Sequence, residues 1–145
     1  MKAFPIGLGL QDSASLQFSW IFSSATDSSD PGANTFKFNN SDPALVTEIY
    51  LSSVAYPNRN VANILGQISQ GDRFYAQERI SATSYINCDV IAAPIDNGSY
   101  WTIPVSVFDS EDSFTPNQFC DFLIYHIGGG GGSGGNGERA RMNTI

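Results

Sequence analysis

The stretch from Ser84 to Asp109, SYINCDVIAAP-IDNGS-YWTIPVSVFD, decides the fold. Two runs rich in β-branched and aromatic residues flank Asp96-Asn97-Gly98, and an Asn-Gly pair accepts the positive φ of a tight turn. In the second run every other residue from Trp101 to Val107 is apolar, as a strand with one buried face requires. The stretch therefore predicts a β-hairpin.

Five further segments have the composition of strands and lie between turn signals. They are Ser15–Ser23, Thr35–Asn39, Val46–Ser52, Asp72–Ile80 and Phe119–Ile127. The last is apolar on both faces, which is typical of a central strand or of one buried against another subunit. Together with the hairpin, these segments predict an all-β fold, a β-sandwich or flattened barrel of about seven strands.

One short helix is expected within this fold. Asn60 can cap it, and the apolar residues that follow have the spacing of one buried helical stripe. These are Val61, Ile64, Leu65 and Ile68. Gly66 and Gly71 limit the helix to roughly two turns.

The two ends of the chain differ from residues 15–127, the predicted domain. Residues 1–14 form an arm, expected to be flexible, in which Pro and Gly argue against a helix. It is either a frayed terminus or an extended segment that adds to a neighbour's sheet edge. Its alternating apolar residues favour the second reading: Phe4, Ile6, Leu8 and Leu10.

A glycine-rich tail, residues 128–145, ends the chain. Gly128–Gly137 contains eight glycines, and a random coil of that length spans about 17 Å. The tail is either an expression linker or a native tether. The terminal residues GERARMNTI match no common tag and favour the tether.

Composition narrows the classes of protein. The 145 residues suffice for one domain with tails, and 14% charged residues is low against about 25% in typical domains. Met1–Ile127 holds 13 acidic and 5 basic residues, a net charge of −8. Nucleic-acid binding and an anionic membrane surface are therefore unlikely partners by charge. No run predicts a membrane span or a signal peptide, so we expect synthesis in the cytosol.

Reactive residues are few. Cys88 and Cys120 lie in predicted strands and could pair if those strands are neighbours, but buried reduced thiols are the favoured interpretation. His126 is the only histidine, within an apolar strand, so a structural role is favoured over catalysis. Without a CxxC motif, zinc is not supported.

Carboxylates offer two weaker hypotheses. Asp27 and Asp30 could hold calcium, but the full acidic pattern of such a loop is missing, and turn residues are favoured. A hydrolytic pair could be drawn from Asp109, Glu111, Asp112 and Asp121. Nothing in the sequence sets the separation that such chemistry needs, so a solvated acidic loop is favoured. We predict no catalytic residue, no metal and no cofactor.

Aromatic residues suggest a sugar-binding alternative, because a ring can stack on the C–H face of a sugar while nearby polar groups bind its hydroxyls. The candidates are Tyr56, Tyr75, Tyr85, Tyr100 and Trp101. Tyr100 and Trp101 are the first choice as glycan contacts. The competing interpretation places these rings in the core or in a subunit interface.

Five motifs in order resemble a known family. They are TDSSDPGANTFKFNN (26–40), TEIYLS (47–52), GDRFYAQ (71–77), YWTIPVSV (100–107) and FTPNQ (114–118). From Leu16 to Gly137 the chain resembles a small all-β domain of bacteriophage virion structural proteins, found in tail fibres and appendages, commonly upstream of collagen-like or glycine-rich segments.

The resemblance implies a non-enzymatic virion protein that forms homo-oligomers, with trimers usual, and contacts other virion proteins. It supplies no catalytic residue. The long fibre body that would follow a glycine-rich segment is absent, which favours a short appendage, adaptor, fibre base or capsid-surface protein. Alternatives are a capsid-decoration or head-fibre protein, or a module that recognises host carbohydrate.

Assembly is expected to depend on the two ends of the chain, because several weak attachments in one oligomer raise its effective affinity. The residues expected to make these contacts are Phe4, Ile6, Leu8, Leu10, Arg139, Arg141, Met142 and Ile145.

Overall fold

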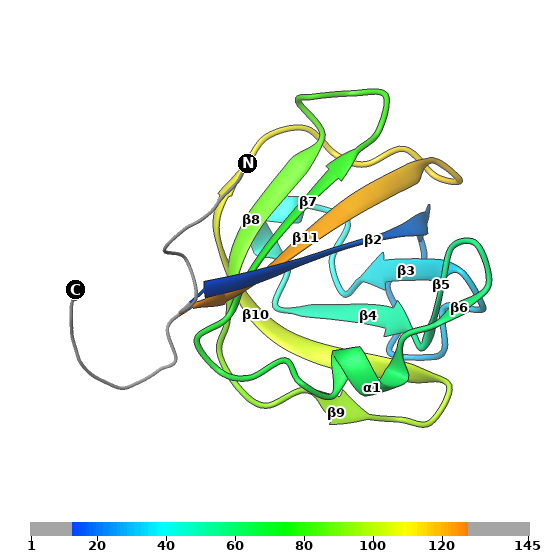
Figure 1. The fold of residues 1–145 in the computed structure, drawn as a ribbon. Coiled ribbons are helices and arrows are strands. Elements are labelled where there is room, and N and C mark those ends of the chain that lie inside the picture. The colour runs from blue at the N-terminus through cyan, green and yellow to red at the C-terminus, as the bar shows by residue number, and fades with distance from the viewer. Residues whose placement is uncertain (1–12, 128–145) are drawn as a thin grey trace, which may run out of the picture.

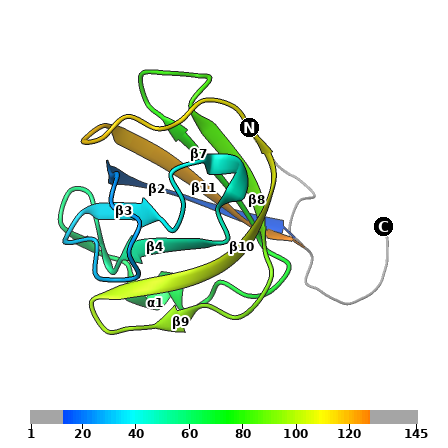
Figure 2. The ribbon, with the colours of Figure 1, turned by 180° about the vertical axis from the view of Figure 1, so that it is seen from behind.

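Seven strands close into a β-barrel in this computed structural model, which describes residues 13–127 and the side chains of residues 17–125. They are β2 (Ser13–Ser23), β3 (Thr35–Phe38), β4 (Glu48–Ser52), β7 (Arg73–Glu78), β8 (Tyr85–Val90), β10 (Tyr100–Ser110) and β11 (Phe119–Ile127). Their order is β4-β3-β2-β11-β7-β8-β10, and β10 pairs with β4 to complete the circle (Figures 1 and 2). The all-β prediction is confirmed, with the barrel as the observed architecture.

The odd number of strands constrains the topology. Antiparallel neighbours alternate in direction, so a closed ring of seven strands needs at least one parallel pair. That pair is β2–β3, where Ile21–Ser23 lie beside Thr35–Lys37. Parallel neighbours cannot be joined by a tight turn. Residues 24–34 therefore run back along the barrel before β3 begins.

The predicted hairpin forms in two parts. The Asn97-Gly98 turn, with Gly98 at φ +91°, joins β10 to the short strand β9 (Ile95–Asp96). The predicted partner β8 pairs instead with Val105–Ser110, the second half of β10. The first half of β10 pairs with β4. A strand of eleven residues is long enough to serve all these neighbours.

The predicted helix is shorter than expected. Helix α1 (Ala62–Leu65) is one turn, and the Oδ1 of Asn60 accepts a hydrogen bond of 3.0 Å from the Ala62 N–H. The apolar stripe is nevertheless buried at Val61, Leu65 and Ile68, with Ile64 packed against the core. Burial of this stripe, not helix length, fixes the segment on the barrel.

The remaining elements are short. They are the 3-10 turn η1 (Pro43–Leu45) and the two-residue strands β5 (Val54–Ala55) and β6 (Arg59–Asn60). The predicted arm loses two residues to the barrel, because β2 begins at Ser13, which pairs with Ile127. In residues 13–127 no helix is long and apolar enough to cross a membrane.

Aromatic rings fill the interior of the barrel. The Phe36 ring is fully buried, and its centroid lies 4.7 Å from that of Phe122 and 5.3 Å from that of Phe22. Trp20 packs on Phe122 at 5.1 Å, and its indole N–H donates to the Ser52 carbonyl at 3.1 Å. Edge-to-face contacts between aromatic rings stabilise the fold beyond what burial of the rings contributes. Strands β2, β3 and β11 thus pack on one cluster inside the barrel.

We expect Phe36→Ala to lower the free energy of unfolding by about 3–5 kcal/mol, because it leaves a cavity in a packed aromatic cluster. Phe108→Ala is the matched control, since Phe108 is 52% exposed and makes one cation–π contact, with Arg73 at 4.6 Å. Its cost should stay below about 1 kcal/mol. Chemical denaturation measures both, and equal costs would contradict this description of the core.

Candidate functional site on the outer face of the barrel

The predicted glycan contacts separate in the structure. Trp101 points into the barrel and is 9% exposed, and a Cβ at Gly66, after α1, would lie 3.5 Å from the tip of its ring. This ring offers no face to a sugar. Tyr100 is half-buried at the surface, where its hydroxyl donates to the Ser28 carbonyl at 3.4 Å. The sequence placed Trp101 on the apolar face of its strand, and that signal was the correct one.

The predicted assembly residues lie outside the described part of the chain. They are Phe4, Ile6, Leu8, Leu10, Arg139, Arg141, Met142 and Ile145. The described structure gives only the points where these segments join the barrel. Residue 12 precedes Ser13 of β2, and residue 128 follows Ile127 of β11.

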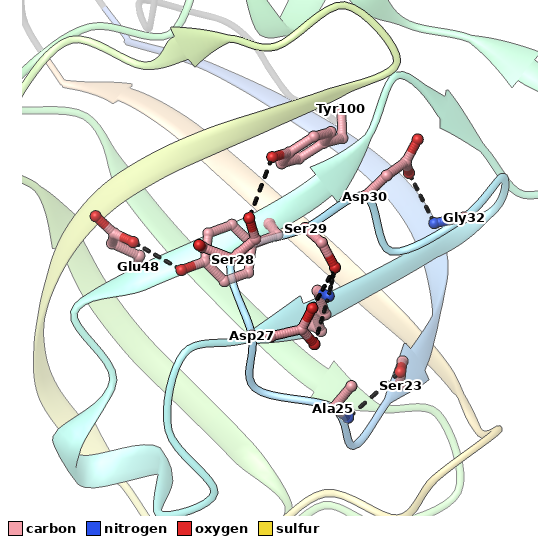
Figure 3. A network of polar contacts seen from close by, with 11 residues as sticks. Ser23, Ala25, Asp27, Ser28, Ser29, Asp30, Gly32, Glu48 and Tyr100 are labelled. Carbon is pink, nitrogen blue, oxygen red and sulfur yellow. Dashed lines mark hydrogen bonds and ion pairs between the residues drawn. The ribbon is translucent and has the colours of Figure 1, made fainter.

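Residues 24–34, here called the strap, cover the outer surface of β3 and β4 (Figure 3). Beneath the strap lies Lys37, whose side chain is only 3% exposed. Its Nζ donates to Asp27 at 3.1 Å and to Ser29 at 2.9 Å. At the far end of the strap, the Ser99 hydroxyl donates to the Asp30 carboxylate. The strap is therefore a structural cover in which both aspartates have partners.

These partners explain the electrostatics of the strap. Hydrogen bonds from Ser29 and then Lys37 lower the pKa of Asp27. Burial, followed by the hydrogen bond to Glu48, raises the pKa of Tyr50 below the strap. Asp30 also accepts from the Gly32 N–H at 2.8 Å, as a turn residue does. The turn interpretation of Asp27 and Asp30 matches this geometry.

A second polar surface lies on the outer face of β2, β11 and β7. Here Gln17, Tyr75, Gln77, Asp121 and Leu123 line an open groove of about 190 Å³, together with the backbone of Phe122. We call these five side chains the outer groove. Its residues come from three neighbouring strands whose registers are fixed by the β11 pairings.

Asp121 is held firmly in the outer groove. Its Oδ1 accepts from the Ser19 hydroxyl at 2.6 Å and from an Arg79 Nη at 2.9 Å. The hydrogen bond from Arg79 lowers the pKa of the Asp121 carboxyl, and the bond from Ser19 acts in the same direction. The Arg79 guanidinium also lies over the Phe119 ring at 5.2 Å. The carboxylate is therefore ionised and pre-oriented at neutral pH.

Tyr75 forms one wall of the outer groove. Its ring stacks on Tyr85 of β8, with centroids 5.8 Å apart and planes at 26°. Its hydroxyl donates to the Gln77 Oε1 at 2.6 Å, and burial raises the pKa of Tyr75, so the phenol stays protonated. The sequence included Tyr75 and Tyr85 among its aromatic candidates but had no signal to prefer them over Trp101.

A second hollow, of about 230 Å³, lies at one end of the barrel. Its base is formed by core rings, including Phe22, Phe38 and Phe114, and its rim by small polar residues of three loops. These rings belong to the main core, so we interpret this hollow as the place where the core packing reaches the surface. It contains no charged side chain.

The carboxylate candidates on β10 and β11 are not brought together. Asp109 and Asp121 lie on β10 and β11 with β7 and β8 between them, about 14 Å apart across three strand spacings. That exceeds the separation used in either kind of glycoside hydrolysis. Among residues 13–127 no three His, Cys, Asp or Glu side chains could hold a metal ion. Of His126 only the backbone is described, paired with Ala14.

Cys88 and Cys120 are both buried and free, as the sequence favoured. Their strands are separated by β7, which pairs with both. Burial raises the pKa of the Cys88 thiol to about 12 and also raises that of Cys120.

Both thiols should resist alkylation by iodoacetamide at pH 8 while the protein is folded, since the reactive thiolate is scarce and covered. Mass spectrometry should show no adduct in the native protein and two adducts after denaturation. Fast labelling of either cysteine in the folded state would contradict the burial.

The stability of the protein should fall as the pH is lowered below about 5, because the unfolded state binds protons on Asp27 and Asp121 more readily than the folded state. The melting temperature of Asp121→Asn should therefore fall less between pH 5 and pH 2 than that of the unchanged protein. Asp112→Asn, an exposed carboxylate outside these contacts, is the matched control and should behave like the unchanged protein. Identical acid profiles for all three would contradict the role of Asp121.

Comparison with known proteins finds no relative of this chain. No family model matches the chain, and neither a curated protein nor a solved structure matches it. Its function must be argued from its own residues.

Proposed function

We propose that this chain is a non-enzymatic structural protein of a bacteriophage virion, a tail-fibre or appendage component. It self-assembles, with a trimer as the expected form, and attaches to neighbouring virion proteins through its two ends. The proposal combines the five sequence motifs with one observation of the fold. The chain enters and leaves the barrel at one place, where Ser13 pairs with Ile127.

The two ends of the barrel chain lie side by side. Ser13 at the start of β2 pairs directly with Ile127 at the end of β11, so their Cα atoms are about 5 Å apart. The segments 1–12 and 128–145 therefore start from one place on the surface. The other end of β2, at Ser23, is about 30 Å away along the strand. Attachment at one place leaves the strap and the loop 111–118 free to face outward.

The first half of β2 also presents an open edge. The Ser19 carbonyl accepts from the Tyr56 N–H at 2.9 Å, and the Ile21 N–H donates to the Asn34 carbonyl at 2.8 Å. These backbone groups point away from β11. Because alternate residues of a strand share a direction, the backbone groups of Gln17 and Ser15 do so as well. Within residues 13–127 no strand pairs with them on that side.

An open strand edge can accept an extended segment from another chain. The arm has the alternation of apolar residues that such a strand addition uses, in Phe4, Ile6, Leu8 and Leu10. Charge supports attachment through the C-terminal tail. With 13 acidic and 5 basic residues, Met1–Ile127 carries −8, whereas Arg139 and Arg141 against Glu138 give the tail +1, opposite in sign to the rest of the chain. Several such contacts in one oligomer reinforce one another.

Deleting residues 1–12 or 128–145 should leave the barrel folded but prevent incorporation into particles, because the proposed contacts are lost while the core is kept. Purified particles made with each truncated chain as the sole copy would be assayed for the protein, and sedimentation would give the oligomeric state in solution. The control replaces residues 1–12 by a Gly/Ser segment of equal length. Normal incorporation of both truncations would overturn the proposal.

A further inference from the structure

We propose that the outer groove binds one neutral hexopyranose ring, the terminal sugar of a surface glycan. This inference goes beyond the proposed function, because it concerns a ligand site on the barrel wall and not the attachment of the ends. It is carried by the register of three strands, by one aromatic ring that lines the outer groove and by three polar side chains with unused hydrogen-bonding capacity.

The strand register builds the outer groove from two adjacent rows. Gln17 is opposite Leu123, and Leu123 is opposite Tyr75, so these three side chains form one row across β2, β11 and β7. The next row on the same face places Asp121 opposite Gln77. Across two strand spacings Gln17 and Tyr75 are about 10 Å apart. Leu123 lies between them as an apolar floor wide enough for one ring.

Tyr75 supplies the wall on which a sugar can stack. A ring has two faces, and Tyr85 on the β8 side covers one of them. Tyr75 also lines the outer groove, and on the β11 side Leu123 is paired with it. The C–H groups on one side of a pyranose carry a partial positive charge that complements the negative face of an aromatic ring. The Tyr75 hydroxyl bond to Gln77 keeps the ring in place.

Polar side chains around the outer groove can still form hydrogen bonds. A carboxylate can accept about four hydrogen bonds. The Asp121 carboxylate accepts two at Oδ1 and one at Oδ2, the latter from Arg79 at 3.3 Å. The Gln77 amide nitrogen has one long contact of 3.4 Å, to the Glu78 carbonyl, and so has hydrogen to donate. Gln17 is exposed. One acceptor and two amides suit neighbouring hydroxyl groups, which both donate and accept.

Charge and size select the class of ligand. The Arg79 guanidinium is already paired with Asp121, so no unpaired cation among the lining residues would attract an acidic sugar. The volume of about 190 Å³ is below the range of roughly 300–1,000 Å³ for drug-sized ligands. A single uncharged ring is therefore the best fit, bound weakly and strengthened by the multiple copies of an oligomer.

The test is a titration of the full chain, labelled with nitrogen-15, with methyl glycosides of glucose, galactose, mannose and N-acetylglucosamine, and with glucuronate as the anionic comparison. We expect saturable shifts of backbone amides at Gln77, Asp121 and Leu123 with at least one neutral sugar. Tyr75→Ala should weaken that binding about tenfold, whereas Tyr75→Phe, which keeps the ring, should weaken it much less.

Gln17→Ala should weaken binding about threefold by removing one exposed amide, and the matched control Gln70→Ala, an exposed glutamine outside the outer groove, should change nothing. Melting temperatures show whether each variant is folded. If Tyr75→Ala does not fold, Gln17→Ala still tests the proposal. No saturable shift with any neutral sugar, equal binding by Gln17→Ala and the unchanged protein, or tighter binding of glucuronate would overturn the proposal. None of these outcomes depends on incorporation into particles.

Discussion

The structure depends on the pairing of β10 with β4, which closes the barrel. β10 can form this pair and also the pair with β8 because it is eleven residues long: Tyr100–Pro104 pair with β4 and Val105–Ser110 with β8. Within the part that pairs with β8, the register shifts between Val107 and Asp109, and such a bulge increases local twist and bends the strand. Closure removes most of the edges that an open sheet would expose, leaving the first half of β2 open, and it encloses the aromatic cluster around Phe36.

The strap is a consequence of that closure. Seven strands require the parallel pair β2–β3, and a parallel connection must travel back along the barrel. The returning residues cover Lys37, and a buried ammonium needs a partner. Asp27 supplies it at 3.1 Å while remaining 67% exposed itself. Two aspartates that resemble a calcium loop in the sequence are therefore occupied with structural contacts, Asp27 with Lys37 and Asp30 with Ser99 and Gly32.

Apart from Gln17, the two proposals use different residues of the barrel, and they do not compete. Attachment concerns the neighbouring ends of β2 and β11 and the open edge of β2, whereas the outer groove lies on the face formed by β2, β11 and β7. Gln17 belongs to both regions, through its backbone at the edge and its side chain in the outer groove. A segment added at this edge would extend the sheet beside the outer groove and leave its side chains outward, because side chains stand perpendicular to the plane of strand pairing.

The sequence by itself determined the strands and their buried faces, because alternation is a local property that needs only neighbouring residues. Trp101, Ile103 and Val105 are buried as their alternation indicates, and so are Phe18, Trp20 and Phe22. It also indicated two buried, unpaired cysteines. Only the tertiary structure decided which strands are neighbours, since pairing is set by long-range closure. That closure separated Asp109 from Asp121 and placed Gln17, Leu123 and Tyr75 in one row, although they are far apart in the chain.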